Sequence, residues 1–66
     1  MKNTVKVQRA IKNITQAELA ELIQVSRQTI NTIESGKYVP STVLALKIAG
    51  VFGIPVEEVF MLEEGD

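Results

Sequence analysis

The feature that most constrains the fold is a pair of short helical segments joined by the tripeptide QVS. The first segment begins at Thr15, because Thr15 with Glu18 three residues later forms a capping box. The second begins after Ser26, a residue type favoured just before a helix, and ends at Gly36, which readily adopts the left-handed conformation. Two helices this short and this closely joined must cross at a steep angle, which is the helix-turn-helix arrangement.

Cap and turn signals divide the rest of the chain into three further helices, so the sequence predicts an all-α domain. Asn13 stops the first helix, Ser41 caps the fourth after Pro40, and Pro55 opens the fifth. Gly50 inside the fourth helix suggests that another backbone comes close there. The expected helices span residues 4–12, 16–23, 27–34, 42–52 and 56–61. A small ribbon between the end segments VKV and FML remains an alternative.

The chain of 66 residues makes one small domain whose core needs support. It has no cysteine and no histidine, which excludes a disulfide and a zinc site with sulfur and nitrogen ligands. We therefore expect a second subunit as support, with no metal and no cofactor. No apolar run is long enough to cross a membrane, and the N-terminal residues lack the apolar segment of a signal peptide. The absence of cysteine is compatible with a cytoplasmic location.

Charge is unevenly distributed along the chain, although the net charge is only −1. All seven basic residues precede Glu57, and only Glu18, Glu21 and Glu34 oppose them there. The remaining acidic residues lie at the C-terminal end. A basic face is therefore possible if the C-terminal segment folds away from it.

The expected helix 27–34 has an unusual polar surface. Ile30 and Ile33 mark its buried side at about 100° per residue. The outer side carries amides, hydroxyls and one guanidinium, from Arg27, Gln28, Asn31, Thr32 and Ser35. Thr, Asn and Ser are weak helix formers, so lysine or glutamate would make a better solvated face. Amides and guanidinium match the base edges of the major groove, which favours DNA recognition over a merely solvated helix.

Glu34 lies on a different side of this helix, nearer to Ile30 than to the outer face. A partly buried carboxylate requires a cationic partner, and we expect Arg9 to supply it. Two independent surface charges are the alternative, because most ion pairs in proteins are exposed and contribute little.

The whole pattern resembles the Cro/C1-type (Xre-type) helix-turn-helix regulators of phages, bacteria and archaea. The resemblance covers Val5 to Phe60 and includes TQAELA, the Val25-Ser26-Arg27 start, ESGK and VFGIPVEEVF. It implies a five-helix, lambda-repressor-like fold whose helix-turn-helix is formed by helices 2 and 3. It also implies a short stand-alone form, with a domain at residues 5–60, an acidic tail at 61–66 and binding of double-stranded DNA as a homodimer.

The resemblance implies roles for individual side chains. Arg27 and Gln28 align with the principal base readers, and Asn31 and Thr32 with further groove contacts. Gln16 aligns with a residue that contacts phosphate and braces the recognition helix. Ser26 and Thr29 are expected to contact phosphates or thymine methyl groups. Lys37 and Tyr38 align with contacts to the DNA backbone from the loop after the recognition helix. The resemblance also implies that Arg9 and Glu34 form a largely buried ion pair between helices 1 and 3.

Two positions depart from the family pattern. Gln24 stands where the turn usually has glycine, and a side chain in the left-handed region costs on the order of 1 kcal/mol. Gln8 stands where the family usually has a large apolar residue. The family alignment turns Val5 inward, whereas an apolar stripe on the same helix favours another orientation, and both remain open. That stripe consists of Val7, Ala10, Ile11 and Ile14.

The favoured function is a sequence-specific transcriptional regulator, with repression as the default, in the cytoplasm of a prokaryote or acting for a phage. The alternative is an antitoxin-type or bridging module of the same fold whose protein partner the sequence does not identify. An enzyme is not expected, because Ser26, Ser35 and Ser41 have no histidine or other base to activate them.

Overall fold

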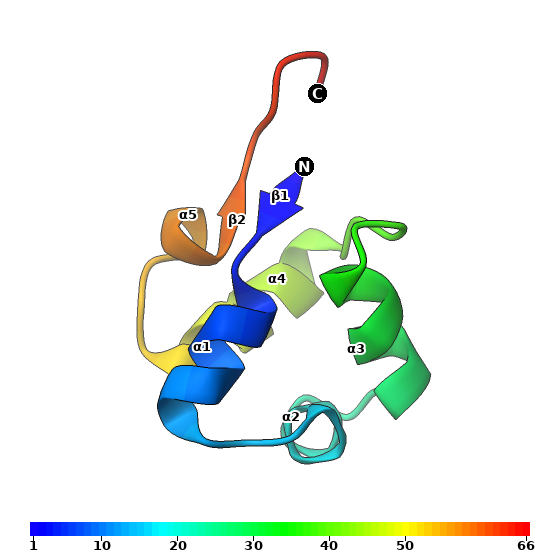
Figure 1. Cartoon of the computed structure of the whole chain (residues 1–66), viewed down its shortest axis with the longest axis vertical. Coiled ribbons are helices and arrows are strands. Elements are labelled where there is room, and N and C mark those ends of the chain that lie inside the picture. Colours follow the sequence, from blue (N-terminus) through cyan, green and yellow to red (C-terminus); the bar gives the residue numbers. More distant parts are fainter.

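The computed structural model describes all 66 residues as five helices and a two-stranded ribbon (Figure 1). The helices are α1 (Val5–Lys12), α2 (Gln16–Leu22), α3 (Arg27–Glu34), α4 (Thr42–Phe52) and α5 (Val56–Val59). The strands β1 (Lys2–Asn3) and β2 (Phe60–Met61) pair antiparallel. The expected five-helix, all-α class is confirmed, since the ribbon only joins the two ends of the chain. None of the helices is long and apolar enough to cross a membrane.

The ribbon corrects two expectations about the chain ends. The fifth helix ends at Val59 and not at residue 61, because Phe60 has extended backbone angles (φ −123°, ψ 127°) and pairs with Asn3. The segment VKV belongs to α1, so the strand that faces β2 is Lys2–Asn3 instead. Beyond the ribbon, the ammonium group of Met1 lies 3.1 Å from carboxylate oxygens of both Glu63 and Asp66.

The predicted caps explain where the helices begin. Thr15 forms the expected capping box with Glu18, each accepting a hydrogen bond from the backbone N–H of the other. Ser26 and Ser41 each accept a backbone N–H at the start of α3 and α4. Asn13 ends α1 in the left-handed conformation, with φ of 56°. These local signals set the lengths of the helices and therefore the positions of their faces.

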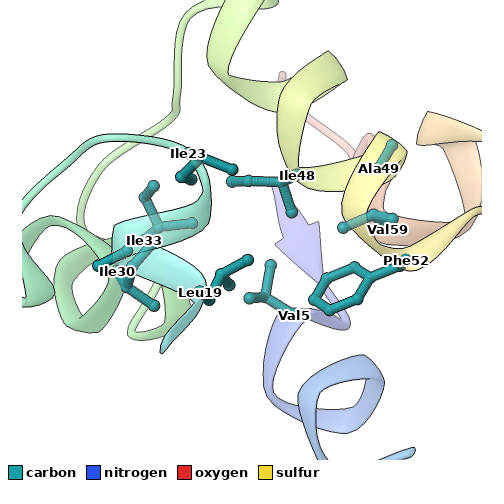
Figure 2. Packing of buried hydrophobic residues seen from close by; sticks show 10 residues of the cluster. Val5, Leu19, Ile23, Ile30, Ile33, Ile48, Ala49, Phe52 and Val59 are labelled. Carbon is teal, nitrogen blue, oxygen red and sulfur yellow. The ribbon is translucent and has the colours of Figure 1, made fainter. Parts of the chain in front are cut away.

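The core brings apolar side chains from all five helices into one cluster (Figure 2). Leu19, Ile30 and Ile33 gather on the side of α2 and α3, Phe52 and Val59 on the side of α4 and α5, and Val5 lies between the two groups. The domain is held by burial of these groups, because each fully buried aliphatic side chain contributes about 1.5–3 kcal/mol.

The core also settles the orientation of α1. Val5 is fully buried, whereas Val7 and Ile11 are 56% and 70% exposed, so α1 turns inward the side that the family alignment indicated.

The expectation for Gly50 is wrong. This residue is exposed, and no atom from outside its own stretch of helix lies within 4 Å of where a Cβ would stand. No other backbone therefore approaches it.

We expect Leu19→Ala to lower the free energy of unfolding by about 2–5 kcal/mol, because it leaves a cavity where α2 meets α3. Leu22→Ala on the same helix is the matched control, since Leu22 is 61% exposed while Leu19 is fully buried. Urea unfolding followed by circular dichroism measures both changes. Equal losses in the two variants would contradict the assigned core.

Candidate nucleic-acid interface

The turn between α2 and α3 keeps a regular geometry although it contains no glycine. Gln24 occupies the left-handed region, with φ of 61°, as its position in the turn predicted. Its N–H donates to the carbonyl of Glu21 at 3.2 Å, and the N–H of Val25 donates to the carbonyl of Ala20 at 2.9 Å. These two bonds are those of a Schellman motif, which ends α2 and sends the chain into α3. The strain at Gln24 therefore does not break the turn.

The outer side of α3 projects from the domain as a polar face. Ile30 and Ile33 are buried, while Arg27, Gln28 and Asn31 are exposed. Thr29 and Thr32 are half-buried at the edges of this face. The arrangement agrees with the helical wheel, and no acidic side chain stands on the outer face. A helix with such a face presents donors and acceptors to whatever approaches it.

Two shallow hollows flank Gln28. One, of about 200 Å³, is lined by Gln16, Arg27, Gln28 and Asn31. The other, of about 410 Å³, is lined by Gln28, Thr29, Thr32, Lys37 and Tyr38. The structure thus brings together eight of the nine residues expected to contact DNA: the helix residues and the loop after α3 border one continuous surface. Ser26, the ninth, stands directly before α3.

Ser26 and Thr29 are engaged with each other at the start of α3. The Ser26 hydroxyl accepts the Thr29 backbone N–H at 3.1 Å, and the two hydroxyl oxygens are 2.9 Å apart. One turn later, the Thr32 hydroxyl donates to the Gln28 carbonyl at 2.8 Å and accepts from Gln28 Nε2 at 3.3 Å. Arg27 has no protein hydrogen-bond partner, so its guanidinium is free to bind a ligand.

Arg9 and Glu34 form the expected ion pair between α1 and α3. Arg9 Nε donates to Glu34 Oε2 at 2.6 Å and Arg9 Nη2 donates to Oε1 at 3.1 Å, while Nη1 reaches the Ile14 carbonyl at 3.1 Å. The side chains of Arg9 and Glu34 are only 15% and 7% exposed. Two parallel bonds in a sheltered position fix the geometry of both side chains.

Gln16 connects this ion pair to the polar face. Its Nε2 donates to Glu34 Oε1 at 3.0 Å and to Asn31 Oδ1 at 3.4 Å. The first residue of α2 is therefore held against α3 by its side chain as well as by the turn. This contact agrees with the bracing of the recognition helix that the family resemblance implied.

The electrostatics of Glu34 follow from these contacts. Burial alone raises the pKa of the Glu34 carboxyl, but the hydrogen bonds from Arg9 and Gln16 outweigh it, and the pKa is lowered below its ordinary value. The hydrogen bonds that Arg9 donates to Glu34 raise the pKa of Arg9 in turn. Both groups are therefore charged in the folded domain at neutral pH.

Asn3 has a structural role that the sequence did not indicate. Its Nδ2 donates to the Ile33 carbonyl at 3.0 Å, and its Oδ1 accepts the Val5 N–H at 3.2 Å. One side chain thus attaches β1 to the C-terminal end of α3 and begins α1. An asparagine two residues before a helix start is a signal for the second contact; nothing local signals the first.

The acidic residues of α5 lie away from the polar face. Figure 1 shows α5 on the opposite side of the domain from α3. The C-terminal segment extends beyond the ribbon, and Leu62 shares an apolar groove with Val39 and Pro40 of the loop after α3. No acidic side chain lines either hollow beside Gln28. The net charge of −1 does not describe the surface that α3 presents.

Comparison with known proteins agrees with this geometry. The sequence model of the helix-turn-helix family matches residues 5–59. The chain belongs to the Cro/C1-type helix-turn-helix family. As a member of this family the protein is not an enzyme, which confirms the expectation from its sequence.

Several relatives have the same short length. An HTH-type transcriptional regulator of Methanocaldococcus jannaschii is 52% identical over 66 residues, which is 100% of both chains. One of Bacillus subtilis is 52% identical over 64 residues, or 97% of each chain. One of Archaeoglobus fulgidus is 47% identical over 64 residues, covering 97% of this chain and 90% of the relative. The chain is therefore similar along nearly its whole length to other short helix-turn-helix proteins.

We expect Glu34→Gln to remove a pH-dependent part of the stability. Because the pKa of Glu34 is lowered by folding, its contribution is complete above the ordinary value near 4.5 and is lost as the pH falls through the folded pKa. The variant should be less stable than wild type at pH 7, and the difference should shrink towards pH 2.

Denaturant melts at a series of pH values measure this effect. Glu57→Gln, on the exposed surface of α5, is the matched control and should follow the wild-type acid profile. A constant difference between Glu34→Gln and wild type from pH 7 to pH 2 would contradict the assigned charge pair.

Proposed function

We propose that this protein is a sequence-specific DNA-binding transcriptional regulator that places α3 in the major groove. The observation that supports it most is the outer face of α3, where exposed amide and guanidinium groups stand on a rigid base. The family and the regulators named among its relatives support the same reading. Arg27 would read guanine and Gln28 adenine, while Asn31 and Thr32 would make further groove contacts.

Backbone contacts would hold α3 in register. Gln16, Ser26 and Thr29 stand at the N-terminal ends of α2 and α3, where helix N–H groups and hydroxyls suit a phosphate. Lys37 and Tyr38 lie in the exposed loop after α3 and would contact the backbone on the other side of the groove. These contacts supply affinity without sequence information.

The regulator would act as a homodimer on a palindromic operator, with half-sites about 34 Å apart. An apolar groove of about 320 Å³ supports a second copy of the chain as its partner. The groove includes Val39, Pro40, Leu46, Phe60 and Leu62, and its loop part directly follows Lys37 and Tyr38.

We propose repression as the direction of control, because a DNA-bound dimer acts most simply by blocking the access of RNA polymerase to a promoter. In this proposal residues 5–60 form the working domain and residues 61–66 an acidic tail. The protein would act in the cytoplasm of a prokaryote or for a phage.

A second candidate function is an antitoxin-type or bridging module that binds another protein. Val7 and Ile11, one turn apart on α1, are 56% and 70% exposed and lie outside the groove. Such a pair offers apolar area that a protein partner could cover. This function predicts a defined protein partner together with weak, unselective DNA binding.

Selection of bound duplexes from a randomised pool tests the proposed function. Wild type should enrich one palindromic motif, and enrichment of none at modest salt would contradict sequence-specific binding.

We expect Arg27→Ala to cost about 1–3 kcal/mol of binding free energy and to relax the base preference at one position of the motif. Lys37→Ala should instead weaken binding to all sequences and reduce the salt slope by about one unit, because it removes a phosphate contact. Uniform weakening by Arg27→Ala, together with a changed base preference in Lys37→Ala, would overturn the proposed roles.

We expect Leu46→Glu to prevent dimerisation, because it places a charge in the apolar groove, where Leu46 is 56% exposed. Ile11→Glu is the matched control on α1 and should leave the dimer intact. Sedimentation equilibrium measures both. If Ile11→Glu abolished the dimer and Leu46→Glu did not, the dimer interface would lie on α1 and not in the apolar groove.

A further inference from the structure

Four side chains form a continuous hydrogen-bonded chain from α1 to the outer face of α3. Arg9 donates to Glu34, Glu34 accepts from Gln16 at 3.0 Å, and Gln16 also donates to Asn31 at 3.4 Å. The two ends differ in exposure, since the Arg9 and Glu34 side chains are largely buried and Asn31 is exposed. These hydrogen bonds therefore connect the buried charge of Glu34 to Asn31 on the proposed DNA-reading face.

The donors and acceptors of Glu34 and Gln16 determine how the amide of Asn31 is oriented. An ionised carboxylate only accepts hydrogen bonds, so Gln16 must turn its amide nitrogen, and not its oxygen, towards Glu34. That same nitrogen carries a second hydrogen, which is directed at Asn31. Asn31 must accept it with Oδ1. The amide nitrogen of Asn31, with its two hydrogens, is then the group left free for a ligand.

We propose that Glu34 acts through Gln16 to fix the amide direction of Asn31, so that Asn31 turns its amide hydrogens towards a ligand and reads guanine in preference to adenine. This inference rests on the proposed function. Guanine presents two acceptors in the major groove, N7 and O6, whereas adenine presents the N7 acceptor beside an N6 donor. Because Oδ1 already accepts a hydrogen bond from Gln16 and is turned towards α2, Asn31 makes the two-bond pairing with adenine less readily than a free asparagine does, although the oxygen keeps a second lone pair.

Gln28 provides an internal contrast on the same helix. Its Nε2 gives one hydrogen to Thr32 at 3.3 Å, which leaves Oε1 and the other N–H free. That combination of one acceptor and one donor suits adenine. The two amides on α3 thus read different bases because their protein partners differ, although an isolated glutamine and asparagine have the same preference.

Arg9 is a positioning residue in this scheme, since it touches no DNA. Its bidentate contact keeps the Glu34 carboxylate in place and ionised, in agreement with the lowered pKa of that group. The amide direction of Asn31 is therefore kept at neutral pH, where Glu34 carries its charge.

The test compares wild type with three variants in selections from one randomised duplex pool. Asn31→Ala identifies the base pair that Asn31 reads, as the motif position whose preference it removes. At that position wild type should favour guanine over adenine. Gln16→Met removes the amide but leaves the Arg9–Glu34 pair untouched, so the fold is kept and Oδ1 of Asn31 becomes free. We expect the guanine-to-adenine ratio to fall by about three- to tenfold, the size of one hydrogen bond.

The guanine-to-adenine ratio at this position is the decisive readout. If Gln16→Met only removed a phosphate contact, duplexes with guanine and duplexes with adenine would be weakened equally. Gln8→Met, the same change on α1, is the matched control and should keep the wild-type ratio. Gln16→Met should also keep the preferences at the positions read by Arg27 and Gln28.

The outcomes separate this inference from the proposed function. No enriched motif with wild type would contradict the proposed function itself. An enriched motif in which Asn31→Ala changes no position, or in which wild type favours adenine there, would overturn the inference alone. A guanine-to-adenine ratio that is the same in wild type and Gln16→Met would overturn it as well.

Discussion

The bidentate pair between Arg9 and Glu34 is the interaction on which the proposed reading surface depends. Truncating one partner of a buried pair typically costs about 3–5 kcal/mol, whereas replacing both by apolar groups is often neutral. Net stability therefore does not explain why a domain this small keeps charges at this position. The pair joins α1 to α3 at a defined distance and angle, and through Gln16 it reaches Asn31. Its contribution is the orientation of α3 and of the side chains that α3 carries.

The rest of the fold supports the same helix from other directions. Ile30 and Ile33 bury one side of α3 against Leu19, and the Schellman turn through Gln24 sets the angle between α2 and α3. Asn3 then secures the far end of α3 from the ribbon. Because the helix is held at its start, on its buried side and at its end, its outer face can be polar without endangering the fold. The poor helix formers on that face are tolerated because burial and caps, and not propensity, hold the helix in place.

Local signals predicted most of the fold, and long-range contacts account for what they missed. The side chains of Thr15, Ser26 and Ser41 predicted the helix starts, since a cap depends on residues three positions away. The ribbon was misplaced because two-residue strands carry no periodic pattern and exist only by pairing across the domain. For the candidate site, periodicity predicted which residues of α3 face outward. The direction of the Asn31 amide was beyond it, because that direction depends on Gln16 and Glu34, which lie on other turns and helices.

The outer face of α3, held by α1 and α2, is the surface that we propose meets DNA. A titration of ¹⁵N-labelled protein with its selected duplex, followed by NMR, tests this contact. We expect the side-chain amide signals of Gln28 and Asn31 to shift most, together with the backbone signals of α3 and of Lys37. Signals of α3 that stay in place while those of α1 or α5 move would contradict it.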